Sequence, residues 1–253
     1  MRYQGGKSRI AKSIADILTK VGEKEKYNNN KSLDFISLFC GSCVIESKVD
    51  NFDKIICNDK HTYLIEMFKG LQNGYELPDE ISKEQYVYIK KNKDLDKVLT
   101  GFVGFGCSFG CSFGGKWFGG YAKSKTNTNY ALQSKKSLLK DMATLMDVEF
   151  ICSDYREVEL PKDCVIYADP PYNNTTGYGK EKFNSEEFWK YARNTSKEHL
   201  MFVSEQTAPD DFVSIWERPF TRTLDVNKQN QFKVTEKLFI HSCNLEKYNS
   251  IFT

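Results

Sequence analysis

Asp169-Pro170-Pro171-Tyr172 places two hydrogen-bond acceptors and an aromatic ring at one point of the chain. The prolines fix φ and lack an N–H donor, so the backbone here is rigid. The Asp169 carboxylate and the Pro170 carbonyl can accept both N–H groups of an exocyclic amine, and Tyr172 can stack on an extruded base. An amine held in this way can attack an electrophilic methyl group in line. We therefore predict that these four residues are catalytic; the alternative is a strand followed by a Pro-Pro turn with Asp169 as a cap.

A turn of small residues, Cys40-Gly41-Ser42, follows the apolar segment Leu33–Phe39. Small residues after a strand let a nucleotide-like ligand approach the backbone. Asp59 lies 18 residues beyond Gly41, where an acidic side chain can accept hydrogen bonds from ribose hydroxyls; a helix N-cap is the alternative. The full G-x-G-x-x-G pattern is absent, which favours a nucleoside cofactor over a dinucleotide.

Tyr3-Gln4-Gly5-Gly6-Lys7 precedes the first expected helix. Two glycines and a lysine at a helix N-terminus can hold a carboxylate. The segment is not a P-loop, because G-x-x-x-x-G-K is absent. A flexible N-terminal tail is the alternative.

Short apolar segments separated by helical stretches must position these groups. Helical spacing of apolar residues from Ile10 to Val21 predicts a helix that starts near Ser8. Strands are expected at Leu33–Phe39, Lys54–Asn58, Val148–Cys152, Val165–Ala168 and His199–Ser204, with a hairpin from Arg222–Val226 and Glu236–His241. This pattern predicts an α/β fold with a doubly wound, mostly parallel sheet. Four strands stop at Gly or Asp, and ligands bind outside the carboxyl ends of such strands.

The composition sets broad limits on the function. A chain of 253 residues fits one α/β domain with an insertion, and a net charge of +2 does not by itself indicate a polyanionic partner. We expect no membrane span and no signal peptide, because no apolar run is long enough. The eight cysteines and three histidines show no zinc spacing, so we expect no metal and reduced thiols.

The segment 101–120 holds half of the 16 glycines, with five phenylalanines and one tryptophan. We expect neither an ordinary helix nor a long strand here, but part of an insertion whose phenylalanines form a small core. The predicted division is 1–62 and 147–253 for the two parts of the main fold and 63–146 for the insertion.

The chain closely resembles the DNA adenine-N6 methyltransferases of the Dam type (D12 class), in particular those of bacteriophages. The resemblance is carried by motifs that occur in the same order as in the family: Tyr3–Lys7, Phe39–Ser42, Asp59, Asp154 and Asp169–Tyr172. The resemblance covers nearly the whole chain. It implies a Rossmann-like class I methyltransferase fold with an inserted target-recognition subdomain. It also implies S-adenosylmethionine as cofactor and double-stranded DNA as partner.

The resemblance implies a role for individual residues. Lys7 would lie near the cofactor carboxylate, Asp59 would bind the ribose, and Asp154 and Tyr155 would flank the cofactor adenine. Cys43 stands where the family usually has glycine. The implied cofactor site consists of Tyr3, Gly6, Lys7, Phe39, Cys40, Gly41, Ser42, Asp59, Asp154, Tyr155 and Asp169.

Since the family reads DNA through its insertion, lysines and amides in this part of the chain are candidate DNA contacts. A solvated helix face is the alternative for the lysines. The candidates are Lys116, Lys123, Lys125, Asn127, Asn129, Lys135, Lys136 and, after the catalytic loop, Tyr178.

The expected function is site-specific methyl transfer from S-adenosylmethionine to N6 of a flipped-out adenine in double-stranded DNA. Methylation of cytosine N4 or RNA adenine and a catalytically silent DNA-binding decoy are the alternatives. We expect a cytoplasmic protein of a bacterial or phage-infected cell, monomeric in solution, with a dimer possible on DNA.

Overall fold

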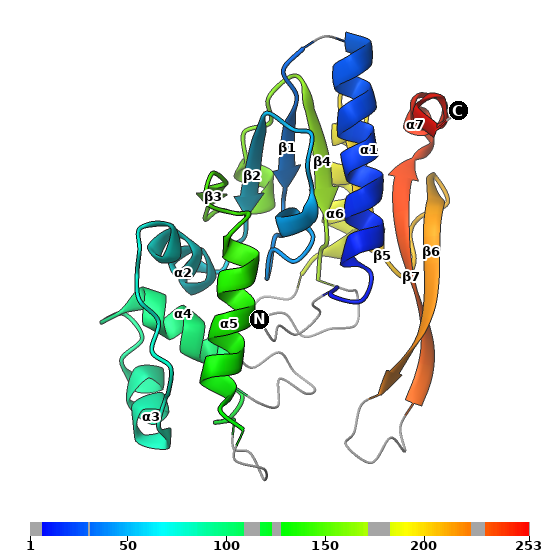
Figure 1. The fold of residues 1–253 in the computed structure, drawn as a ribbon. Helices are drawn as coiled ribbons and strands as arrows, with labels where there is room; N and C mark the ends of the chain where they lie inside the picture. Colours follow the sequence, from blue (N-terminus) through cyan, green and yellow to red (C-terminus); the bar gives the residue numbers. More distant parts are fainter. Residues whose placement is uncertain are drawn as a thin grey trace.

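The computed structural model describes residues 7–29, 31–108, 117–122, 128–171, 183–223 and 231–252. Within these residues seven strands form one sheet (Figure 1). Their order across the sheet is β3-β2-β1-β4-β5-β7-β6. The strands are β1 (Asp34–Ser37), β2 (Lys54–Asn58), β3 (Glu149–Ile151), β4 (Cys164–Ala168), β5 (Leu200–Glu205), β6 (Phe212–Thr223) and β7 (Gln231–His241).

The sheet is parallel at its centre. β1 pairs with β2 and β4, β2 pairs with β3, and β4 pairs with β5, all in parallel. β7 runs antiparallel to both β5 and β6. The chain therefore builds outward from β1 in two opposite directions, and the topological switch point lies between β1 and β4. The predicted doubly wound, mostly parallel, Rossmann-like sheet is confirmed.

Helices cover both faces of the sheet (Figure 1). Phe35 packs with helix α1 (Ala11–Asn29) and helix α7 (Leu245–Phe252), whereas the next residue, Ile36, packs with helix α6 (Ser185–Thr195) on the opposite face. Because both faces are buried, the central strands are apolar throughout rather than alternating. The predicted stripe of the first helix is confirmed, since Ile10, Ile14, Leu18 and Val21 are buried in this core.

Among the described residues between β2 and β3, where the insertion is predicted, the chain forms four helices. Phe68 stacks on Phe150 of β3 with a centroid distance of 4.9 Å. Phe102, Phe105 and Phe118 belong to the same apolar cluster as these two residues. The insertion therefore shares its core with the sheet instead of forming a separate one. The helices are α2 (Thr62–Gln72), α3 (Lys83–Lys91), α4 (Lys97–Gly106) and α5 (Tyr130–Met142).

The expectation that the segment 101–120 contains no ordinary helix is wrong for its first six residues, because α4 begins at Lys97 and extends through Gly106. A Cβ on Gly101 would clash with the backbone carbonyl of Tyr63 in α2, and one on Gly104 would clash with the indole of Trp117. The glycines thus permit close packing of α4. That packing outweighs the roughly 1 kcal/mol that each glycine costs in a helix.

The predicted hairpin exists, but its strands are longer than expected. β6 begins at Phe212 instead of Arg222, and β7 begins at Gln231 instead of Glu236; residues 224–226 of the prediction lie outside the described residues. A register shift between Ser214 and Trp216 interrupts the alternation in β6. Pro219 also lies within the strand, which is possible because β6 is the last strand of the sheet.

Short 3-10 helices complete the described residues: η1 (Glu46–Lys48), η2 (Tyr155–Glu157) and η3 (Ser242–Asn244). Among the helices that the structure describes, none has the length and apolar character needed to cross a membrane.

Candidate functional site

The predicted site residues after β1, β2, β3 and β4 meet at the carboxyl edge of the sheet, because these neighbouring strands run parallel. Leu38 N donates to the carbonyl of Tyr167 in β4 (2.9 Å), and Cys40 N donates to the carbonyl of Asn58 in β2 (2.8 Å). The turn after β1 is therefore fixed on both sides at the switch point of the sheet.

Gly41 and Cys43 both have left-handed backbones in this turn, with φ of 49° and 52°. A glycine adopts this conformation freely, whereas a cysteine adopts it at a cost of about 1 kcal/mol. Cys43 is fully buried, so its side chain packs into the core under the turn. The cysteine that replaces the family's usual glycine therefore has its side chain on the core side of the turn.

Asp59 links this turn to the end of β2. Its Oδ2 accepts from Gly41 N (3.0 Å) and its Oδ1 accepts from His61 N (2.8 Å). Burial raises the pKa of Asp59, and these two N–H groups oppose that shift. The N-cap of α2 is His61 and not Asp59, so the capping alternative is wrong. Each carboxylate oxygen retains a lone pair that can accept from a ribose hydroxyl.

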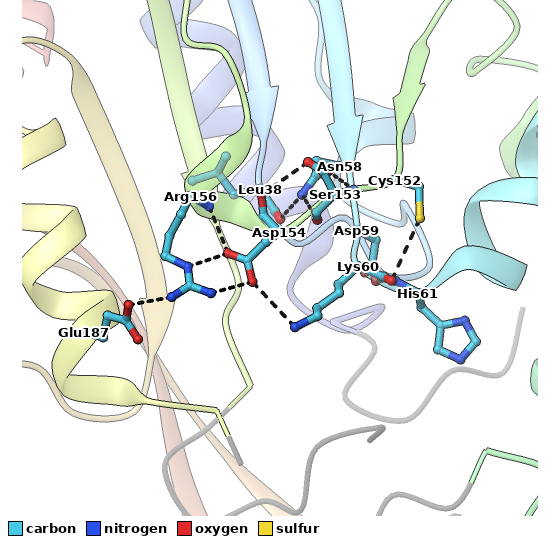
Figure 2. A network of polar contacts seen from close by, with 10 residues as sticks. All are labelled: Leu38, Asn58, Asp59, Lys60, His61, Cys152, Ser153, Asp154, Arg156 and Glu187. Atoms are coloured by element: carbon cyan, nitrogen blue, oxygen red, sulfur yellow. Dashed lines mark hydrogen bonds and ion pairs between the residues drawn. The ribbon is translucent and has the colours of Figure 1, made fainter. Parts of the chain in front are cut away.

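Asn58 holds three strand ends together, as Figure 2 shows. Its Nδ2 donates to the carbonyls of Leu38 (3.0 Å) and Ser153 (3.2 Å), and its Oδ1 accepts from Ser153 N (3.0 Å) and Oγ (3.1 Å). The side chain is buried and its amide is fully hydrogen-bonded, which rigidifies this edge. Asn58 was not among the predicted site residues, although an asparagine at the end of an apolar strand is a recognisable signal in the sequence.

Asp154, which follows β3, forms an ion pair with Arg156. Arg156 contacts Asp154 through Nε (2.7 Å) and Nη2 (3.0 Å) and reaches Glu187 of α6 through Nη1 (2.5 Å) (Figure 2). Lys60 Nζ lies 3.6 Å from Asp154 Oδ2, the oxygen that Arg156 Nη2 also contacts. The hydrogen bonds from Arg156 lower the pKa of Asp154, so this carboxylate is an ionised acceptor.

Aromatic rings form a wall beside Asp154. Phe39 is half-buried and packs against Tyr155 and Phe188, with centroid distances of 5.2 and 5.8 Å. Tyr155 is only 7% exposed and contacts Tyr191 edge-on. Phe39 therefore presents more of its ring at this edge, with Tyr155 packed behind it.

Asp169 lies directly after β4 and is paired with Lys7. Lys7 Nζ is 3.1 Å from Asp169 Oδ1 and 2.9 Å from Glu236 Oε2 of β7. The side chains of Lys7 and Glu236 are 3% and 4% exposed, whereas that of Asp169 is 23% exposed. Burial raises the pKa of Asp169 to about 6, and the ammonium of Lys7 opposes that shift. The structure thus brings Lys7 to the predicted catalytic carboxylate.

Further acids that the sequence analysis did not single out lie in this region. Burial raises the pKa of Glu205, at the end of β5, to about 7 and that of Glu46 in η1 to about 8. Glu46 Oε1 accepts from Ser37 Oγ at 2.6 Å. Tyr167 and Ser204 share a buried hydrogen bond of 2.9 Å. The region behind Asp169 is therefore buried, polar and rich in carboxyl groups.

Of the candidate DNA-contacting residues that the structure describes, some contact other protein groups and others are exposed. Asn129 caps α5 and donates to the carbonyl of Asp79, while Lys135 Nζ contacts the carboxylate of the same Asp79 at 2.6 Å. Lys136 is exposed on α5. The predicted residues Tyr3, Gly6, Tyr172, Tyr178, Lys116, Lys123, Lys125 and Asn127 lie outside the described residues.

In the part of the chain that the structure describes, the cysteines are free thiols. In that same part no group of three or more His, Cys, Asp or Glu side chains is arranged to hold a metal ion.

The chain is similar to known methyltransferases. Type II methyltransferase M.FokI of Planomicrobium okeanokoites is 25% identical over 205 residues, which cover 70% of this chain and 32% of that protein. The chain thus spans about a third of the length of this relative. A SAM-dependent methyltransferase from Agrobacterium tumefaciens (8% identity, TM-score 0.35) matches over 91% of this chain and 62% of its own. A dimethyladenosine transferase from Plasmodium falciparum (11% identity, TM-score 0.31) matches over 89% and 62%.

The family model for D12 class N6 adenine-specific DNA methyltransferases matches residues 3–100 and 114–213. These two segments are well over half of the 253 residues. They contain the turn at Gly41, the ribose candidate Asp59 and the Asp169 loop in the family's order. The chain belongs to the D12 class N6 adenine-specific DNA methyltransferase family.

Proposed function

We propose that this chain transfers a methyl group from S-adenosylmethionine to N6 of a flipped-out adenine in double-stranded DNA. The observation that carries the proposal is the partly exposed Asp169 carboxylate at the switch point, directly beside the turn after β1. Family membership supports the choice of adenine N6.

The cofactor site that we propose has the chemistry of a nucleoside site. The turn at Gly41 has no side chain to keep a ligand from the backbone, Asp59 offers acceptors for ribose hydroxyls, and Phe39 offers a ring face for a base. S-adenosylmethionine, when bound, supplies a methyl group on a positively charged sulfur. The several carboxylates at this edge suit a cationic ligand.

Asp169 and Pro170 would orient the target amine. Both oxygens are acceptors, so they take the two N–H groups and leave the nitrogen lone pair directed at the methyl group. Transfer converts NH₂ to NHCH₃, so one proton leaves N6, and the Asp169 carboxylate or solvent accepts it. Lys7 favours the ionised form of Asp169, in which the carboxylate can accept the N–H.

We propose that the insertion, residues 63–146, recognises the DNA. The helices α3, α4 and α5 lie on one side of the carboxyl edge and the β6–β7 hairpin extends on the other (Figure 1). A duplex placed between them would bring a flipped base to Asp169. Lys136 and Lys140 are exposed on α5 one turn apart and are suited to phosphate contacts.

We further propose that the protein acts in the cytoplasm as a monomer, with dimerisation on DNA as the alternative. Sedimentation of the protein with and without duplex DNA distinguishes the two states.

Transfer of label from tritiated S-adenosylmethionine to adenine-containing duplex DNA tests the function. We expect label in the DNA. Bound cofactor without label in DNA would instead identify a silent DNA-binding protein, and label in RNA but not DNA would identify a different substrate.

A further inference from the structure

Lys7 is shared by two carboxylates that come from different parts of the fold. Its Nζ lies 2.9 Å from Glu236 Oε2 and 3.1 Å from Asp169 Oδ1. Glu236 belongs to β7, two strands away from β4 in the sheet. Lys7 and Glu236 are both almost fully buried, so the pair can rearrange only if the core moves.

A purely structural role explains this arrangement poorly. A buried ion pair recovers in Coulomb attraction little more than it loses in desolvation, and apolar residues of similar size often stabilise a core as well. The pair is also connected to the partly exposed Asp169, which is the predicted catalytic group. This connection points to a role in the reaction.

We propose that Glu236 is a positioning residue for methyl transfer: it anchors the ammonium of Lys7 so that Lys7 contacts one oxygen of Asp169 and leaves the other for the target amine. The inference rests on the proposed function. It assigns Glu236 a role that acts through Lys7, without contact with the substrate.

The anchor also affects how basic Asp169 is. Without Glu236 the ammonium would lose one of its two described carboxylate partners, and the negative charge of Glu236 that raises the pKa of Asp169 would be lost. A less basic carboxylate is a weaker acceptor for the amine N–H and for the departing proton. The charged and titratable groups that influence Asp169 are Lys7 before α1, Glu46 of η1, Tyr167 of β4, Glu205 of β5 and Glu236 of β7.

Glu236→Gln tests the inference, because glutamine keeps the size and one acceptor for Lys7 but removes the charge. We expect the pKa of Asp169, followed by ¹³C NMR of its carboxyl carbon without ligands, to fall by about one unit. The acid limb of the kcat profile should move to lower pH by the same amount. The plateau kcat should fall roughly tenfold, with little change in KM for the cofactor.

Glu217→Gln is the matched control. Glu217 also lies on the hairpin and pairs with a lysine, Lys237 at 3.7 Å, but it is 62% exposed and away from Asp169. This variant should leave the Asp169 titration and kcat unchanged. If Glu236→Gln prevents folding, Glu236→Asp keeps the charge at a longer distance and should shift the titration in the same direction by less.

A Glu236→Gln protein with an unchanged Asp169 titration, and with kcat reduced equally at every pH, would overturn the inference. Failure of the proposed function is distinguishable, since then the wild-type protein would transfer no methyl group at any pH.

Discussion

In the proposed reaction Asp169 must be ionised to accept an amine N–H, yet it lies where burial opposes ionisation. The structure meets both conditions: burial raises its pKa to about 6 and Lys7, 3.1 Å away, limits that rise. The carboxylate is therefore mostly ionised at neutral pH and is more basic than an exposed aspartate. A group tuned in this way is typical of catalytic sites.

Asp169→Ala should lower the rate of methyl transfer by about 10²- to 10⁴-fold, because it removes the acceptor that orients the amine. Cofactor affinity should change little, since the turn at Gly41 and Asp59 remains. Asp163→Ala is the control: Asp163 is exposed and precedes the same strand at its opposite end. Single-turnover kinetics and calorimetric cofactor binding measure the two effects. A loss of both properties in Asp169→Ala would contradict the separation of roles.

The carboxyl group of Glu46 predicts a pH-dependent stability. Its folded-state pKa of about 8 lies above the ordinary 4.5, so the folded protein holds a proton that the unfolded chain releases between these values. The stability of the fold should therefore fall as pH rises from about 4.5 to 8. Glu46→Gln should remove this loss and raise the free energy of unfolding at pH 8 by about 1 to 3 kcal/mol, with little effect at pH 4.5.

Urea unfolding at a series of pH values measures this difference. The exposed Glu23→Gln of α1 should show no such trend. A stabilisation by Glu46→Gln that is equal at all pH values would mean that packing, and not ionisation, is responsible.

At the residue scale, the sequence predicted positions that are set locally. Asp169 and Asp59 follow strands directly, so their place at the carboxyl edge of the sheet could be predicted, and their roles stay predictions. Glu236 could not be predicted in this way, because it meets Lys7 only through the pairing of β7 with β5, across 229 residues of chain. Tertiary contacts of this length leave no local pattern.

At the element scale, α4 shows why glycine content misled the prediction. A high glycine content indicates a flexible backbone. It does not indicate which glycines are needed because a neighbouring element packs too closely for a side chain. In α4 that neighbour is α2, whose Tyr63 carbonyl faces Gly101. The parallel strands, by contrast, were predicted well because each is a short apolar segment with a polar end.

Gly101→Ala should destabilise the protein by about 1 to 3 kcal/mol, even though alanine favours helices, because the added methyl group clashes with the backbone of α2. Gly106→Ala in the same helix is the control and should cost less, since its Cβ would meet the side chains of Ser134 at 3.1 Å and Phe102 at 3.4 Å, both farther away than the Tyr63 backbone is from a Cβ on Gly101. Denaturant titration compares the two. Equal stability of Gly101→Ala and wild type would contradict the packing that we describe.

At the scale of the whole molecule, the helices between β2 and β3 and the β6–β7 hairpin flank one edge of the sheet (Figure 1). The insertion was expected at 63–146, and the sequence did not predict that the helices of this segment share a core with β3. That shared core fixes α2 against the sheet. It provides a rigid support from which the proposed DNA-binding surface would be positioned relative to Asp169.

Lys136→Gln combined with Lys140→Gln should weaken binding to duplex DNA and reduce the slope of log K against log salt by about 2, since about 0.9 is expected for each lost phosphate contact. Lys24→Gln, on an exposed position of α1, is the control and should change neither quantity. Fluorescence anisotropy at several salt concentrations provides both values. If the double variant has an unchanged slope, these two lysines do not contact the DNA phosphates.

We propose that the Asp169 loop methylates N6 of adenine in DNA. Incubation of the protein with duplex DNA and trideuteromethyl-labelled S-adenosylmethionine, followed by mass spectrometry of the digested nucleosides, tests this proposal. We expect labelled N6-methyldeoxyadenosine with the wild type and with Asp163→Ala, and its loss with Asp169→Ala. Label found only in N4-methyldeoxycytidine, or label that persists in Asp169→Ala, would contradict it.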